Sequence, residues 1–318
     1  MSAESADAPV GVGVVGLRPD LEEDPLADLA GAPGFRACAF CNEGIEDDDA
    51  EYGDVPCHSD FNLLLREPEV ELVLVGGPLD RKRDFAVRAL NAGCHVVLQQ
   101  PFCETALDAE RVMKTAFREG LVATMDMKWR DEADLRALRI ALAEENVAPV
   151  HGVQAAWWPP EDQEEGATPP DGLLERMGLA LLDQVNVLVR EDVRDVSAHL
   201  LRPAPGRPET GFLLYLPLRN GGYALARAGR DAVEGLPRWV VTTRGATFSA
   251  ADGAAAVLAA GERRVYRAPK EAQGFWRNLH DAIRTGAELK CHPRDIVRAM
   301  KLHEAALESA ETGRRVTV

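Results

Sequence analysis

Several features are scarce or missing in this 318-residue sequence. There is no uninterrupted apolar stretch of the roughly 18 residues that a membrane-spanning helix needs, so we expect no membrane span. The opening residues, MSAESADAP, contain neither a basic segment nor an apolar core, so we expect no signal peptide. Excess positive charge is also missing, and a net charge of −16 makes nucleic acid and anionic membranes unsuitable partners.

Cysteine is sparse as well, with six residues scattered along the chain. Cys38 and Cys41 form a C-x-x-C sequence inside an expected strand, where their side chains would point to opposite faces. Cys57-His58 has no further metal ligand at a suitable spacing. We therefore expect reduced thiols, a cytoplasmic protein and no metal site.

The most informative stretch runs from Val70 to Phe102. Residues 70–75 are almost wholly apolar, Gly76-Gly77-Pro78 interrupts them, apolar residues then recur at helical spacing over 85–90, and residues 95–98 are apolar again. This order predicts a strand–helix–strand unit with parallel strands. In such a unit the ligand crevice lies at the carboxyl ends of the strands.

The rest of the chain predicts two domains. Apolar strands at 10–15 and 36–41 extend the unit just described, so residues 1–127 should form an α/β domain with a Rossmann-like, doubly wound parallel sheet. From residue 128 the texture changes, and residues 128–318 should form a C-terminal α+β domain, of the substrate-binding or oligomerisation type, with a large, open, mainly antiparallel sheet. Its expected strands lie at 153–158, 193–200, 212–218, 223–228 and 239–243, and its last helices at 271–284 and 294–312.

Residues 70–102 resemble, without a gap, the cofactor-domain core of the Gfo/Idh/MocA oxidoreductases (glucose–fructose oxidoreductase, inositol dehydrogenase and relatives). The likeness continues to the final SAETGRRVTV and so covers nearly the whole chain. In the family the stretch ends in Glu-Lys-Pro, and that lysine takes part in hydride transfer. Here the same place reads Gln99-Gln100-Pro101. An amide neither carries charge nor exchanges a proton near pH 7, so Gln100 cannot do the work of the lysine.

The phosphate-binding loop departs from the family pattern too. Residues 11–16, Gly-Val-Gly-Val-Val-Gly, match G-x-G-x-x-G only formally, because the valines between the glycines belong to the first strand. On the family pattern, only Gly16 takes the place of a fingerprint glycine. Asp20 and residues 22–24 (Glu-Glu-Asp) then fall at the start of the expected first helix, where they would repel a pyrophosphate.

The resemblance makes five residues candidate cofactor contacts: Gly16, Asn42, Gly77, Pro78 and Gln99. Asn42 stands where the family often has an acidic residue for the adenosine ribose, and the acidic loop over 43–54 disfavours a 2′-phosphate. We expect NAD binding to be weak or lost, NADP binding to be less favoured still, and no metal cofactor.

A helix in the second half carries the family pattern Asp-x-Gly-x-His-x-x-Asp, whose positions here read Arg176, Gly178, Ala180 and Asp183. Arg176 stays protonated in proteins and Ala180 has no titratable group, so neither can act as a base. Packing of the leucines on this helix accounts for the segment without any catalytic role.

Two further groups of residues leave alternatives open. Lys82 takes the place of a family histidine within the basic cluster 81–83, which is either a solvated helix start, the interpretation we favour, or a phosphate site. Trp157 with Lys128, Arg130 and Arg176 forms a candidate pocket for an anionic or sugar-like ligand, whereas packing in a core or against a subunit is the structural alternative.

Losses at the phosphate loop, at position 100 and at positions 176 and 180 favour a catalytically degenerate family member. It would serve as a ligand-binding or partner subunit, in a homo-oligomer or with a related subunit. The alternative is an active NAD-dependent dehydrogenase of a sugar, cyclitol or polyol, with a proton relay rebuilt from Lys82, Lys128 or Asp183. A third hypothesis is non-redox chemistry on an anionic ligand near Arg176.

Overall fold

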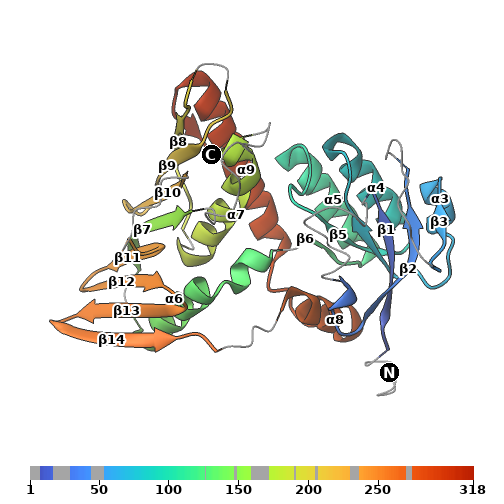
Figure 1. Cartoon of the computed structure of the whole chain (residues 1–318), viewed down its shortest axis with the longest axis horizontal. Helices are drawn as coiled ribbons and strands as arrows, with labels where there is room; N and C mark the ends of the chain where they lie inside the picture. Colours follow the sequence, from blue (N-terminus) through green and yellow to red (C-terminus); the bar gives the residue numbers. More distant parts are fainter. Residues whose placement is uncertain are drawn as a thin grey trace. The chain divides into compact units, whose positions relative to one another are not determined.

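The computed structural model describes residues 8–16, 29–43, 54–125, 127–146, 149–158, 172–189, 191–204, 207–229, 236–269 and 274–318 (Figure 1). The chain divides into two compact units. Unit 1 comprises Met1–Met127 and Gln273–Val297, and unit 2 comprises Lys128–Ala272 and Arg298–Val318. The segment from 273 to 297 therefore belongs with the N-terminal residues, whereas the sequence predicts one unbroken domain over 128–318.

Unit 1 is built on a six-stranded sheet with the order β3-β2-β1-β4-β5-β6, in which every neighbouring pair is parallel. Every residue of β1 and of β4 is buried, as expected of strands with both faces covered. This confirms the predicted Rossmann-like, doubly wound α/β fold. The strands are β1 (Val10–Val15), β2 (Phe35–Cys41), β3 (Cys57–His58), β4 (Leu72–Val75), β5 (His95–Leu98) and β6 (Ala123–Met125).

Two of the three glycines of the formal fingerprint, Gly11 and Gly13, lie inside β1 and are closely packed. A Cβ atom on Gly11 would lie 1.8 Å from the Glu69 carbonyl oxygen, and one on Gly13 would lie 2.7 Å from a Leu64 methyl carbon. A side chain at Gly11 would clash with fixed backbone, whereas one at Gly13 would require Leu64 to shift. The interpretation of residues 10–15 as a strand is confirmed.

The described helices of unit 1 are α3 (Phe61–Leu64), α4 (Leu79–Asn91), α5 (Ala106–Glu119) and α8 (Phe275–Thr285). The Thr105 side chain accepts a hydrogen bond from the Asp108 amide at the start of α5, and Gly120 ends this helix with a φ of 69°. Both ends have the residues that sequence rules predict there, a threonine followed three positions later by an acidic residue at the start and a glycine at the end.

Helix α8 joins unit 1 through its apolar face. Leu279 is fully buried in the core that holds the valines of β1, and the Trp276 ring packs edge-on against Phe35 at 5.1 Å between centroids. Arg284 donates to both carboxylate oxygens of Glu71 at 2.6 and 2.8 Å. Chain order placed α8 in the second domain, but its apolar residues are buried in the first core.

Unit 2 contains a nine-stranded sheet with the order β14-β13-β12-β11-β7-β10-β9-β8-β15. Among its described strands, β7 and β10 pair parallel and the other neighbours pair antiparallel, which confirms the predicted mainly antiparallel sheet. The strands are β7 (Val150–Trp157), β8 (Asp195–Leu201), β9 (Gly211–Pro217), β10 (Tyr223–Gly229), β11 (Trp239–Thr243), β12 (Ala246–Ala251), β13 (Ala254–Ala259), β14 (Glu262–Arg267) and β15 (Val316–Thr317).

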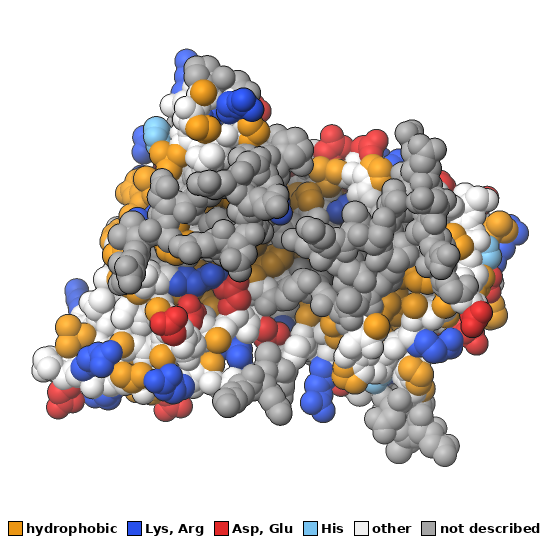
Figure 2. All heavy atoms as spheres, in the orientation of Figure 1, with side chains coloured by type: hydrophobic (Ala, Val, Ile, Leu, Met, Phe, Trp, Pro, Cys, Tyr) orange, Lys and Arg blue, Asp and Glu red, His pale blue; other side chains and the backbone are white. Residues whose placement is uncertain are grey.

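One face of this sheet is covered by helices. Leu138, Val185 and Ala306, from three different helices, join Phe212 and Trp239 of the sheet in one core. The other face leaves large apolar side chains exposed, and Figure 2 shows basic, acidic and apolar side chains interspersed over β12–β14. The helical elements are η1 (Lys128–Asp131), α6 (Ala133–Glu144), α7 (Gly172–Val189) and α9 (Pro293–Thr312). No helix in the described part of the chain is long and apolar enough to cross a membrane.

Replacing Leu279 with alanine should destabilise unit 1 by about 2–5 kcal/mol, because a fully buried leucine leaves a cavity. Arg277→Ala, on the exposed face of the same helix, is the matched control and should change the free energy of unfolding by less than about 0.5 kcal/mol. Hydrogen exchange should locate the loss of protection in β1 and β2. Loss confined to β7–β14 would contradict the assignment of α8 to unit 1.

Candidate functional site

The carboxyl ends of neighbouring parallel strands bring the predicted cofactor contacts of unit 1 to one edge of its sheet. Gly16 follows β1, Gly77-Pro78 follows β4 and Gln99 follows β5, and these three strands are adjacent. The Gln99 amide donates to the Val75 carbonyl oxygen at 2.9 Å, so the ladder extends one residue past β5. This is the edge at which the family resemblance places a dinucleotide.

Gly16 and Gly77 touch at this edge. Both have positive φ, 70° and 77°, and a Cβ on Gly16 would lie 2.8 Å from the Gly76 carbonyl oxygen and 3.0 Å from the Gly77 Cα. The contact between the two loops therefore accounts for both glycines without a ligand. The acidic residues predicted to stand in the pyrophosphate site, Asp20 and 22–24, lie outside the described residues.

At the end of β2, the Asn42 amide donates to the His58 carbonyl oxygen at 3.1 Å. The next residue, Glu43, accepts hydrogen bonds from the Phe61 amide at 2.8 Å and from the Arg81 guanidinium at 2.7 Å. One carboxylate thus accepts a hydrogen bond from the first backbone amide of α3 and neutralises a cation of α4. The remaining acidic residues of this loop, over 44–53, lie outside the described part of the chain.

The prediction of a solvated helix start for the basic cluster 81–83 is wrong for Lys82 alone, since Arg83 is exposed and Arg81 is half-buried near the start of α4. Arg81 binds Glu43, and Arg83 donates to Asp108 at 3.0 Å. Lys82 is only 4% exposed, and its Nζ donates to the carbonyl oxygens of Gln99 at 3.1 Å and Pro101 at 3.0 Å. Burial lowers the pKa of Lys82 to about 8. The signal was in the sequence, because residues 82, 85, 86 and 89 share the helix face that enters the core.

In unit 2, Asp183 of α7 is completely buried and ion-paired. The Arg130 Nε donates to its Oδ2 at 2.7 Å, a second nitrogen of the same guanidinium binds Oδ1, and the Trp129 Nε1 donates to Oδ2 at 3.0 Å. This is the two-pronged geometry in which arginine holds a carboxylate most strongly. Both oxygens of Asp183 are used inside the unit.

Residues that the sequence did not single out complete this cluster. The Gln184 Nε2 donates to the Trp129 carbonyl oxygen at 2.7 Å and to the Glu132 carboxylate at 3.0 Å, and Arg238 pairs with Glu132 at 2.5 Å. Burial raises the pKa of the Glu132 carboxyl group. Together these groups link η1 to α7 and to the residue before β11. Their role is therefore structural.

Three residues of the predicted ligand pocket, Arg130, Trp157 and Arg176, differ in their surroundings. Arg130 is buried against Asp183, Arg176 is exposed, and Trp157 packs at the border of the unit 2 core. The side chain of Lys128 lies outside the described residues. Ala180, at the family's histidine position, is buried.

Gly178, the small residue of the family pattern, has a packing role. A Cβ there would lie 2.7 Å from a Leu174 methyl carbon and 3.1 Å from the His303 ring. His303 is itself buried, its Nε2 is 3.1 Å from the Leu174 carbonyl oxygen, and burial lowers its pKa. The surviving glycine therefore keeps α7 close to α9.

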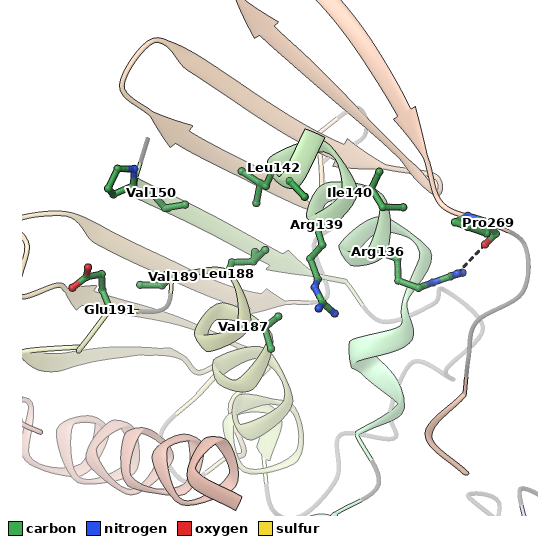
Figure 3. Close-up of a pocket in the computed structure, with 12 residues that line it drawn as sticks. Arg136, Arg139, Ile140, Leu142, Val150, Val187, Leu188, Val189, Glu191 and Pro269 are labelled. Carbon is green, nitrogen blue, oxygen red and sulfur yellow. Dashed lines mark hydrogen bonds between the residues drawn. The ribbon is translucent and has the colours of Figure 1, made fainter. Parts of the chain in front are cut away.

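An open pocket of about 840 Å³ lies elsewhere in unit 2, between α6, β7 and the end of α7 (Figure 3). Its walls are mainly aliphatic, and Arg136 in its lining donates to the Pro269 carbonyl oxygen at 2.8 Å. No residue of the family motifs lines it. Among the described residues there is also no group of three side chains suited to holding a metal ion.

Comparisons with known proteins agree with the fold. A family model described as an oxidoreductase family with an NAD-binding Rossmann fold, GFO_IDH_MocA, matches residues 10–127. An uncharacterised oxidoreductase of Escherichia coli is 26% identical over 136 residues, which are 42% of this chain and 39% of that protein. The scyllo-inositol 2-dehydrogenase (NADP(+)) of Bacillus subtilis is 21% identical over 96% of this chain and 95% of that protein.

A solved structure resembles the whole chain. An oxidoreductase from Agrobacterium radiobacter, in complex with NAD+, L-tartaric acid and magnesium, has a TM-score of 0.80 and 15% sequence identity, covering 98% of both chains. At this identity the likeness establishes the fold.

Asp183→Asn should destabilise the protein by about 3–5 kcal/mol, because it leaves the Arg130 guanidinium buried without a counter-charge. The double variant Arg130→Met/Asp183→Leu removes both charges and should recover most of that loss. Chemical denaturation followed by circular dichroism measures both. Equal destabilisation by the single and the double variant would show that Asp183 acts by something other than charge pairing.

Proposed function

Because this chain belongs to the Gfo/Idh/MocA family, whose NAD-binding Rossmann fold covers residues 10–127, we propose that it is a catalytically degenerate member that serves as a ligand-binding or partner subunit. One observation carries this proposal. Asp183, the one carboxylate among the family's catalytic positions, is fully buried and bound by Arg130 and Trp129.

Oxidation of an alcohol by hydride transfer needs a base that removes the hydroxyl proton as the carbonyl forms. A base must lie within hydrogen-bond reach of that hydroxyl, and the Asp183 oxygens are already taken by donors of their own unit. Gln100 and Arg176 have no basic group near neutral pH, and Ala180 has none at all. The four family positions can thus contribute shape and hydrogen bonds, but no proton acceptor.

The proposal includes weak or absent dinucleotide binding, with NADP less favoured than NAD, and no metal. Arg81 is the cation nearest in sequence to the β4–α4 turn, and it is paired with Glu43. It is therefore committed to a carboxylate rather than to a 2′-phosphate. The described residues at the edge of the sheet do not form the family's catalytic arrangement around a nicotinamide, since position 100 holds an amide.

The second candidate is an active NAD-dependent dehydrogenase of a sugar, cyclitol or polyol. Lys82 favours it, because its amine lies beside the turn that contains position 100. The similarity to a scyllo-inositol dehydrogenase suggests cyclitols as the substrates to try first. Against this candidate, a side chain that is 4% exposed offers little surface to a substrate.

Isothermal titration with NAD, NADH and NADP should give dissociation constants above about 1 mM for the degenerate protein, corresponding to less than about 4 kcal/mol of binding free energy. A panel of cyclitols, sugars and polyols should give no NADH. Micromolar binding of any of the three nucleotides, or NADH formation above the level of a heat-treated control, would favour the second candidate.

The partner role has a surface to support it. Four apolar side chains on the uncovered face of the nine-stranded sheet are 41–57% exposed: Leu213, Tyr215, Leu258 and Val265. Tyr215 is paired in register with Leu225 of β10, so the apolar surface continues across neighbouring strands. We assign this face to a second copy or a related subunit. None of the six cysteines forms a disulfide, which supports the cytoplasm as the compartment.

Tyr215→Glu should shift the protein towards the monomer, because a carboxylate placed in an apolar interface loses its hydration. Phe117→Glu is the matched control, since Phe117 is 90% exposed on α5 of the other unit. Light scattering coupled to size-exclusion chromatography gives the mass of each. A wild-type protein that is monomeric at high concentration, alone and with family relatives from the same cell, would exclude the assembly.

A further inference from the structure

We infer that Lys82 supplies, from helix α4, the positive charge that position 100 lacks, and that it is the positioning residue of the Gln99–Pro101 turn. This inference stands whether or not the chain is catalytic. It concerns how the turn at the end of β5 is held, and it gives the basic residue of α4 a role in the site.

The geometry of the hydrogen bonds carries the first step. The Lys82 Nζ lies 3.1 Å from the Gln99 carbonyl oxygen and 3.0 Å from the Pro101 carbonyl oxygen. These two carbonyls flank residue 100 on either side. One amine therefore ties both ends of the turn to α4, and the backbone on which the residue 100 side chain is mounted is fixed between them.

The burial of the amine carries the second step. Lys82 is 4% exposed on the face of α4 that also buries Phe85, Ala86 and Ala89, each 0% exposed. Burying an ammonium group is costly unless polar groups replace its hydration. Packing on the buried face of α4 would need only an apolar side chain at this position. A lysine there is explained by the two carbonyl oxygens that converge on it and need a donor.

Of the three cations in the cluster 81–83, Lys82 is the one that is not paired with a carboxylate among the described residues. Arg81 pairs with Glu43 and Arg83 pairs with Asp108, whereas both acceptors of Lys82 are backbone carbonyls. The nearby Cys103 thiol is uncharged at neutral pH, because burial raises its pKa to about 12. No carboxylate among the described residues neutralises Lys82, so its charge acts on the turn itself.

The link to position 100 follows from repulsion between like charges. An ammonium at residue 100, as in the family, and a second one bound to the carbonyls on either side would lie within a few ångströms of the same backbone. Two such groups in a partly buried turn disfavour each other's protonated form. The turn therefore accommodates one cation at low cost, from position 100 or from position 82.

The test uses the full chain labelled with ¹³C at the lysine ε carbon, which gives six resonances. The Lys82 resonance is identified by its loss in Lys82→Arg and should titrate near pH 8, well below the ordinary value for a lysine. In Gln100→Lys the Lys82 midpoint should fall by about one unit or more. In Gln100→Met, the uncharged control, it should stay within a few tenths of a unit.

A double-mutant cycle of folding stability measures the coupling between residues 82 and 100. Gln100→Lys should lower the folding equilibrium constant at pH 7 by about tenfold or more, and Lys82→Met should remove most of that effect. The Gln100→Met control should show no such dependence on residue 82. Where Lys82→Met fails to fold, Lys82→Gln takes its place, and the midpoint shift in Gln100→Lys is measured in any case.

The pH dependence has a definite sign. The unfolded lysine keeps its proton up to about pH 10.5, while the folded one loses it near 8, so the wild-type folding constant should rise relative to Lys82→Met by up to about tenfold per pH unit between these values. A Lys82 midpoint at the ordinary value for a lysine, near 10.5, or additive effects in the cycle, would overturn the inference.

Discussion

Parallel strand order is the constraint on which the rest of unit 1 depends. With β1 buried between β2 and β4, and β4 beside β5, the chain segments that leave these strands must meet at one edge of the sheet. There Gly16 and Gly77 are already in contact, and Gln99 continues the ladder. The residues that follow the strands, rather than the fold, therefore decide which chemistry the edge supports.

In both units, several ionised side chains are bound by groups of their own unit. Glu43 holds Arg81, Asp183 holds Arg130, and two backbone carbonyls hold Lys82. A buried charge is tolerated only when it is paired or solvated by polar groups, and breaking such a pair costs more than the pair contributes to stability. Groups that are fixed in this way are poor acceptors of protons from a substrate. The same contacts that make the frame stable thus occupy the oxygens of Glu43 and Asp183.

Much of this frame was readable from the sequence, and what was not has physical reasons. Apolar runs predicted the buried strands, and Thr105 with Gly120 predicted the ends of α5, since these signals are local. An amphipathic pattern shows that a helix has a buried face but not which core that face packs against, so α8 was assigned to the wrong unit. The alanine-rich strands β12 and β13 lack the alternation of large apolar residues that marks a strand. The pairing of Asp183 with Arg130, 53 residues away, leaves no trace in spacing.

The family's proton acceptors at positions 176 and 180 and its ammonium group at position 100 are missing in different ways. At positions 176 and 180 an arginine and an alanine leave no proton acceptor, whereas at position 100 the missing ammonium has a counterpart one helix away, in Lys82. A protein that needed the fold only as a scaffold could place methionine on that face of α4, fill the same volume and avoid burying a charge. Keeping the cation preserves the electrostatic field at the end of β5, where an anionic or oxygen-rich ligand would sense it through the carbonyl-bound turn. The pattern therefore supports the proposed ligand-binding role more than a purely structural one.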